Sequence, residues 1–172
     1  IYDYMNGVGA HEVVVETPDH ARQLHELGEG EITNVLLAYR DRIADLRNDV
    51  RFRYVLPFKN HGAIAGVSIE HTHSQVIALP TVPKQVADEL AGAHEHYQLK
   101  ERCIYCDIVR QELAQRVRLV HENPDFVVFA PFASRFPFEI WVMPRRHRAA
   151  YEETAPGEFG QLASALRTAL RK

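Results

Sequence analysis

The segment around which this chain is organised runs from Asn60 to Gln75 and reads NHGAIAGVSIEHTHSQ. Its two glycines indicate a turn, and the run that follows has the composition of a strand until Pro80 ends it. Alternate residues of a strand point to the same face, so the pattern predicts that His71, His73 and Gln75 project to one side. Two imidazoles and an amide arranged in this way predict a functional site.

Three interpretations of this group are open. The simplest is a polar face of an edge strand. The second is a pair of imidazole ligands for one metal ion in a hydrolase, although the only nearby carboxylate, Glu70, is expected on the opposite face. In the third, one histidine is structural or metal-bound, the other is a nucleophile at phosphorus, and Gln75 donates to a phosphoryl oxygen. Gly62 and Gly66 favour the third, because a turn without side chains lets backbone N–H groups approach an anion.

The segment resembles the active-site motif of the galactose-1-phosphate uridylyltransferase family, a branch of the histidine-triad (HIT) superfamily, and the resemblance extends along nearly the whole chain. The family motif is His-Pro-His-x-Gln, and Thr72 replaces the proline here while Ser74 stands where glycine is frequent. HIT hydrolases carry a third histidine at the position of Gln75, so the glutamine implies a transferase. Thr72 is expected to point away from the site and to affect strand stiffness more than chemistry.

The resemblance implies a double displacement in which His73 takes the uridylyl group of UDP-glucose and galactose 1-phosphate then accepts it. It also implies that His71 is a zinc ligand. A main-chain carbonyl near His71 is expected to fix the His73 tautomer whose attacking nitrogen carries no proton. The residues that the resemblance places against the phosphates are Asn60, Gly66, Ser68 and Gln75.

Other activities of the same superfamily are also open. One is an ADP-sugar or dinucleoside-polyphosphate phosphorylase or adenylyltransferase, which would carry an adenylyl group on the same histidine. Another is a non-catalytic half that is active only with a partner chain. The base pocket is not identifiable in this sequence, so the motif does not choose among them.

Bulk properties narrow the class of protein. The chain has 172 residues, of which 46% are hydrophobic, enough for one ordinary domain or two small modules that share a core. A formal charge of -3 gives no electrostatic case for binding nucleic acid or an anionic membrane. The first residues do not read as a signal peptide, and both cysteines lie in one Cys103-x-x-Cys106 pair, so we expect a cytoplasmic protein.

The remaining patterns predict an α+β fold, with an antiparallel sheet packed by helices. Alternation predicts a strand at residues 52–58, and further strands are predicted at residues 11–16, 116–120, 126–130 and 138–143. Helical patterns cover residues 32–46, 84–102, 104–114 and 157–171. Residues 131–139 form a proline-punctuated loop whose three phenylalanines we expect in the core. Spacing two on a helix predicts that His94 and His96 face solvent.

An internal repeat links the two parts of the chain. Residues 11–20 resemble residues 138–147, because each is a strand that ends in proline and then histidine, with an amphipathic helix beyond. This predicts two incomplete copies of a duplicated HIT-like module. Residues 1–98 would be the C-terminal larger part of the first module, with the active-site motif, and residues 99–172 the N-terminal part of the second.

The resemblance implies Zn²⁺ as cofactor at two sites. It assigns His20 and His71 to a first site, whose other two ligands would precede the sequence, and Cys103, Cys106 and His147 to a second, whose fourth ligand would follow it. For His20 and His147, a capping or surface role is the alternative.

The unmatched ligands and the missing initiator Met predict a fragment or one half of a split protein. A homodimer, a partner chain or the rest of a longer polypeptide would then complete the modules. Alternatively, the two ends of the chain could associate and bring Cys103 and Cys106 near His71.

Overall fold

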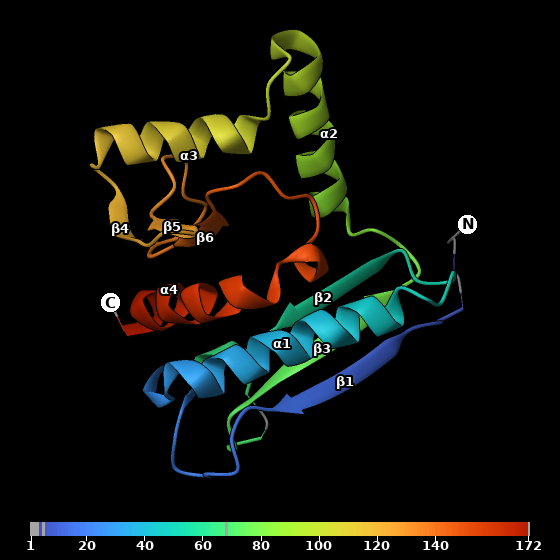
Figure 1. The fold of residues 1–172 in the computed structure, drawn as a ribbon. Helices are drawn as coiled ribbons and strands as arrows, with labels where there is room; N and C mark the ends of the chain where they lie inside the picture. The colour runs from blue at the N-terminus through green and yellow to red at the C-terminus, as the bar shows by residue number, and fades with distance from the viewer. Residues whose placement is uncertain (1–3, 5, 68, 172) are drawn as a thin grey trace.

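The structure is a computed structural model that describes residues 4, 6–67 and 69–171. Within these residues the chain forms two three-stranded antiparallel sheets and four α-helices (Figure 1). The predicted α+β fold with antiparallel sheets packed by helices is therefore confirmed. The element bounds differ from the predicted ones by a few residues at the strand ends.

The first sheet holds the histidine motif on its central strand. It consists of β1 (Ala10–Val15), β2 (Tyr54–Phe58) and β3 (His73–Leu79) in the order β1-β3-β2. Val15 pairs with His73, and Phe58 pairs with Gln75. Because β3 has a partner on each side, its backbone is fixed along both edges. Pro57 is tolerated in β2 because this is an edge strand.

One face of the first sheet is covered by α1 (Glu29–Leu46). The apolar residues of this helix recur with a helical period, and its buried Leu46 packs against Val76 and Ala78 of β3. On the opposite face, Val13 and Val15 of β1 are 54% and 62% exposed. The sheet thus has a buried side and an open side, and His73 and Gln75 belong to the open side through their pairing with β1.

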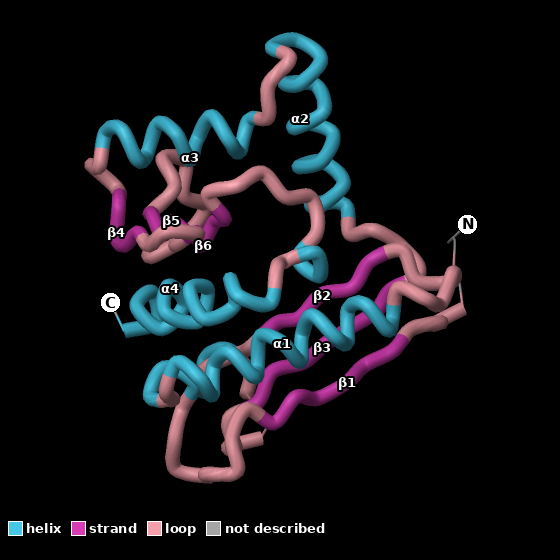
Figure 2. Tube along the Cα trace, viewed as in Figure 1, coloured by secondary structure: helices cyan, strands magenta, loops and turns pink. Residues whose placement is uncertain are grey.

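The second sheet lies between two helices (Figure 2). Its strands are β4 (Leu119–Glu122), β5 (Phe126–Phe129) and β6 (Trp141–Pro144), and β5 is central. Val127 and Phe129 pack against α3 (Ile104–Gln115), whereas Phe126 and Val128 pack against α4 (Phe159–Arg171). Burial on both faces explains why β5 is a continuous apolar run. The helix α2 (Lys84–Lys100) connects the two halves and packs on α3.

The two halves of the chain pack together through α1 and α4, the helices that follow the repeated strands. Their shared core contains Phe159 and Ala163 of α4 together with Ile32 and Leu36 of α1, and Leu27 lies beside them. The short 3-10 turns Leu24–Glu26, Tyr151–Glu153 and Pro156–Glu158 lead into these helices. The repeat seen in the sequence therefore corresponds to equivalent elements: β1 and β6 are both edge strands, and each is followed by a turn and a helix.

Two expectations about side chains are wrong. Phe132, Phe136 and Phe138 are 84%, 61% and 98% exposed, because the buried positions of the second sheet are already filled by β5 and its flanking helices. His96 is half-buried on α2, with Nε2 3.7 Å from Asp107 of α3, because α2 packs on α3 along that side. His94 is exposed, as predicted.

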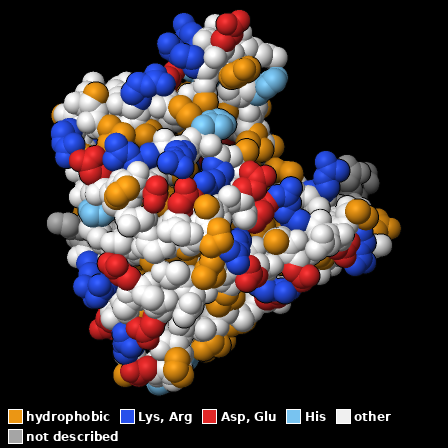
Figure 3. Space-filling view, viewed as in Figure 1, with side chains coloured by type: hydrophobic (Ala, Val, Ile, Leu, Met, Phe, Trp, Pro, Cys, Tyr) orange, Lys and Arg blue, Asp and Glu red, His pale blue; other side chains and the backbone are white. Residues whose placement is uncertain are grey.

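Charged side chains of both signs lie on the face of the molecule that Figure 3 draws. In Figure 3, basic side chains gather over the upper half of this face, and acidic and basic side chains alternate over the lower half. Among the described residues, none of the helices combines the length and apolar character that crossing a bilayer requires.

The interface between α1 and α4 provides a test of how the halves are joined. Phe159 is fully buried in the shared core, so Phe159→Ala is expected to lower the free energy of unfolding by about 4 kcal/mol, because it leaves a cavity between the helices. Urea unfolding followed by circular dichroism measures this. Leu99→Ala, at a position that is 73% exposed, is the control and should change stability by less than about 0.5 kcal/mol. Equal stability of the two variants would contradict the packing described.

Candidate functional site

His73 is the first residue of β3, and a main-chain contact fixes its ring. Its Nδ1 lies 2.8 Å from the carbonyl oxygen of His71. A carbonyl oxygen only accepts, so Nδ1 carries the proton and Nε2 presents a lone pair. The expected carbonyl near His71 is thus confirmed, and it is the carbonyl of His71 itself. The residue is 9% exposed, so most of the ring is covered by protein.

His71 does not share the strand face of His73 and Gln75, and that part of the prediction is wrong. The strand begins only at His73, and His71 lies in the bend before it. Its Nε2 donates to the carbonyl oxygen of Thr17, 2.7 Å away, and its Nδ1 is 2.9 Å from Nδ1 of His20. Strict alternation does not apply outside a strand, so the ring turns toward the segment that follows β1.

The amide of Gln75 is oriented by a histidine that the sequence argument did not assign to the site. Nε2 of His11 lies 2.7 Å from Oε1 of Gln75, and since an amide oxygen accepts, His11 donates. The amide NH₂ of Gln75 is then available to a ligand. His11 is diagonal to Gln75 across β1 and β3, because Val13 is the residue directly opposite. Strand pairing, which the sequence alone did not specify, is the signal that would have found it.

The loop between β2 and β3 contains the glycines of the motif. Gly62 and Gly66 have φ of 80° and 77°, a conformation that favours glycine, and they flank the 3-10 turn Ala63–Ala65. Asn60 and Gly66 are exposed on this loop, and among the described residues no hydrogen bond joins them to His73 or Gln75. Ser68, the other candidate phosphate contact, lies outside the described residues. The glycine turn is confirmed, whereas its contact with a phosphate stays a prediction.

The residues between the site residues point to the buried face of the sheet. Thr72 and Ser74 are 2% and 0% exposed, and both hydroxyls donate to the carboxylate of Glu16. The expectation that Thr72 points away from the site is therefore confirmed. Lys59 completes the cluster, with Nζ 2.9 Å from Oε2 of Glu16. Sequence analysis missed Glu16 and Lys59, although Glu16 continues the alternation that places Val14 on the inner face.

The pair His20 and His71 fits a metal ion as two of its ligands. Two nitrogen ligands of a tetrahedral zinc ion are about 3.3 Å apart, close to the observed 2.9 Å between the Nδ1 atoms. The bond from Nε2 of His71 to the Thr17 carbonyl is the outer contact that metal-bound histidines commonly make. The part of the chain that the structure describes brings two converging ligands together here, and a structural zinc site needs four.

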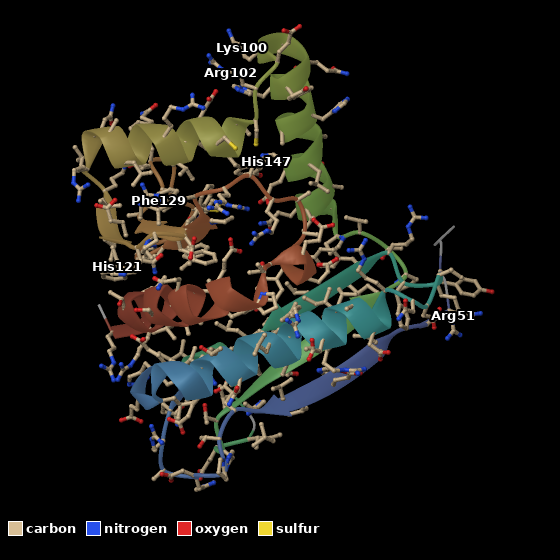
Figure 4. All side chains as sticks on the ribbon, in the orientation of Figure 1. Arg51, Lys100, Arg102, His121, Phe129 and His147 are labelled. Carbon is tan, nitrogen blue, oxygen red and sulfur yellow. The ribbon has the colours of Figure 1, made fainter. Side chains whose placement is uncertain are left out.

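Cys103, Cys106 and His147 form a second candidate metal centre. Their ligand atoms all lie within 4.8 Å of one another, and Sγ of Cys106 is 3.2 Å from Nδ1 of His147. In Figure 4, His147 lies beside the sulfur atoms at the start of α3. Cys103 precedes α3 and Cys106 is in its first turn. Burial, together with the hydrogen bond to Cys103, raises the pKa of the Cys106 thiol. The alternative in which this cysteine pair lies near His71 is wrong for the single chain, because its partner is His147.

Comparisons with known proteins show which proteins this chain is similar to. Residues 1–83 match the family model for the galactose-1-phosphate uridyl transferase N-terminal domain. The chain is 34% identical to an ADP-glucose phosphorylase of Arabidopsis thaliana over 96% of its own length and 46% of that protein. It is 30% identical to a galactose-1-phosphate uridylyltransferase of Thermotoga maritima, over 95% of its length and 51% of the relative.

A solved structure shows the same fold. The crystal structure of an ADP-glucose phosphorylase from Arabidopsis thaliana with bound ADP-glucose superposes with a TM-score of 0.87 at 34% identity, over 95% of this chain and 50% of that one. The chain thus spans about half the length of the relatives it matches. Fold and histidine motif together define an α+β protein of the HIT-like class. Within that class, residues 1–83 match the N-terminal domain of the galactose-1-phosphate uridylyltransferase family, and the chain is similar to a member of that family along 95% of its length.

We propose that the cysteine cluster binds zinc, and this can be tested directly. Cys106→Ala removes a thiolate ligand and is expected to lower the zinc retained after desalting by about one ion per chain. Mass spectrometry of the metal content measures it. His94→Ala is a matched histidine control, because His94 is exposed on α2 and outside both candidate sites. Equal zinc content in wild type and Cys106→Ala would contradict the assignment.

Proposed function

We propose that this protein is a nucleotidyltransferase that carries a nucleoside monophosphate on His73. The observation that supports this most directly is the hydrogen bond from Nδ1 of His73 to the His71 carbonyl. It leaves Nε2 as a nucleophile without requiring a separate base to remove a proton.

The proposed reaction is a double displacement. Nε2 of His73 attacks the α-phosphorus of a nucleotide sugar, a phosphorus–nitrogen bond forms, and the bond to the bridging oxygen breaks, so that a sugar 1-phosphate leaves. A phosphate oxygen of the acceptor then attacks the same phosphorus and displaces His73. While His73 is substituted, its ring bears positive charge, which the His71 carbonyl stabilises through Nδ1–H.

The neighbouring donors would stabilise charge on the phosphoryl oxygens. Gln75 offers its NH₂, because His11 occupies the amide oxygen. The glycine turn between β2 and β3 would add backbone N–H groups, and Asn60, Gly66 and Ser68 stay candidates for this contact. Such donors act where charge develops in the transition state, so the amide orientation bears on the rate more than on binding.

Zinc at His20 and His71 would have a structural role in this proposal. When bound there, the ion would cross-link the segment after β1 to the bend before β3. His71 contributes its ring to the metal pair and its carbonyl to His73, so the same residue would connect the two functions. The other ligands, and any homodimer or partner chain that supplies them, stay proposals that the mass of the zinc-loaded protein in solution would test.

Two nucleotides are candidates for the transferred group. We propose UDP-glucose as donor and galactose 1-phosphate as acceptor, by similarity to the Thermotoga maritima uridylyltransferase. The similarity to an ADP-glucose phosphorylase favours ADP-glucose with inorganic phosphate as the second candidate. We also propose the division into a first module, residues 1–98, and a second, residues 99–172.

Covalent labelling tests the proposed nucleophile. Incubation with UDP-glucose or ADP-glucose labelled at the α-phosphate is expected to add one nucleoside monophosphate to the chain, and intact mass then identifies the base. His73→Ala should abolish the label, because no other residue is proposed to attack phosphorus. The control His94→Ala should keep it. Undiminished labelling of His73→Ala would exclude His73 as the carrier.

The orientation of Gln75 by His11 gives a second test. His11→Leu removes the donor to the amide oxygen and lets the amide rotate, so we expect the rate of transfer to fall roughly tenfold with little change in substrate affinity. Steady-state kinetics separate these parameters. His11→Gln retains an N–H donor at this position and should lose less. A purely increased KM in His11→Leu would show that His11 acts in binding instead.

A further inference from the structure

The buried face of β3 carries a polar cluster directly behind His73. The Glu16 side chain is fully buried, and that of Lys59 is 18% exposed. Oε2 of Glu16 accepts from Nζ of Lys59 at 2.9 Å and from the hydroxyl of Thr72 at 2.5 Å, while Oε1 accepts from the hydroxyl of Ser74. A buried carboxylate is costly unless it is paired and hydrogen-bonded, and here both conditions are met.

Each member of the cluster has its hydrogen-bonding capacity used. Nζ of Lys59 donates to Glu16, to Oγ1 of Thr72 at 3.0 Å and to the carbonyl oxygen of His73 at 3.0 Å. The hydroxyl of Tyr39 donates to Oγ of Ser74. Burial raises the pKa of Tyr39 to about 12, so this hydroxyl stays protonated at neutral pH. A fully satisfied network of this kind rigidifies the groups it connects.

The network fixes the backbone on both sides of the nucleophile. The carbonyl of Thr72 accepts from the backbone N–H of Glu16, and the carbonyl of His73 accepts from Lys59. The carbonyl of His71 in turn accepts from the His73 ring. The three consecutive carbonyls that define the path of the chain at His73 therefore each have a partner. The short run 71–73 cannot rotate without breaking one of these bonds.

We propose that Glu16 and Lys59 are positioning residues for His73, acting through the hydroxyls of Thr72 and Ser74. This rests on the proposed function, because it assigns the cluster to the same nucleophile. Thr72 stands where the family motif has proline and Ser74 where glycine is frequent. In this chain the hydroxyls at those two positions provide, through hydrogen bonds, the local stiffness that the ring of proline would give.

The physical consequence is a narrow range of orientations for the attacking nitrogen. Nucleophilic attack requires the ring to lie close to its productive geometry, and displacements of about 1 Å can reduce a rate about a hundredfold. The cluster lies on the inner face of the sheet, whereas His73 and Gln75 are on the open side, where the nucleotide sugar would bind. Its loss should therefore slow the covalent step while substrate affinity changes little.

The first experiment compares two substitutions of Thr72. Thr72→Val keeps the shape and removes the hydroxyl, whereas Thr72→Ser keeps the hydroxyl. Single-turnover transfer of labelled nucleotide to His73 is expected to slow about tenfold or more in Thr72→Val and by less than about twofold in Thr72→Ser, with the Kd for the nucleotide sugar unchanged in both. Equal rates in the two variants, measured well below their unfolding temperatures, would overturn the proposal.

The second experiment separates positioning from stability. A single substitution of Glu16 or Lys59 leaves a buried charge unpaired and is expected to destabilise the fold, whereas Glu16→Gln combined with Lys59→Met removes both charges and should recover most of the stability. The slow covalent step should persist in the double variant, because Met cannot donate to the His73 carbonyl. A double variant with both wild-type stability and wild-type transfer rate would reduce the cluster to a structural role.

A third readout does not depend on any nucleotide. Long-range proton–nitrogen NMR spectra report which ring nitrogen of a histidine carries the proton. Wild-type His73 is expected to be protonated at Nδ1 alone, and Thr72→Val and the double variant should show a mixture of tautomers. An unchanged tautomer in both variants would contradict the proposal. If wild type takes no label from either nucleotide sugar, the proposed function fails, while this measurement still decides the role of the cluster.

Discussion

The alternation of side chains along the central strand β3 is the constraint on which the site depends. Successive residues face opposite sides of the sheet, so His73 and Gln75 face the open side while Ser74 joins a buried carboxylate behind them. Shifting the register by one residue would exchange the two sets and turn both site residues toward α1. The site and its support are thus specified by one short stretch of backbone with a partner on each edge.

The two halves of the chain share the same order of elements but bring together different side chains. In each, a proline lies at the end of an edge strand or a few residues beyond it, a histidine follows, and a helix packs on the sheet. The histidine meets another potential metal ligand in both cases: His20 meets His71, and His147 meets the cysteine pair. The helices α1 and α4 then pack against each other, so that the two repeated units share a core without sharing a sheet.

Much of this arrangement could be predicted from the sequence, because it depends on local periodicity. The helices, the glycine turn and the strand at β5 follow from spacing and composition, whereas the grouping of Cys103 and Cys106 with His147 is implied by the family resemblance. The failures depend on pairing between distant segments. Strand register sets three of them: the start of β3 at His73, the contact of His11 with Gln75, and the burial of Glu16 beside Lys59. Phenylalanines 132, 136 and 138 are exposed because other residues already fill the core.

The central position of β3 has a consequence for how the protein loses structure. From Gln75 to Ala78 the strand is paired on both edges, and a charged cluster without free donors covers the start of its inner face, so fraying from that end is opposed. Segments of this kind exchange their amide hydrogens mainly through global opening. Reactivity at His73 would then be retained until the whole fold is lost, and the more loosely held loops around it could fluctuate without disturbing the nucleophile.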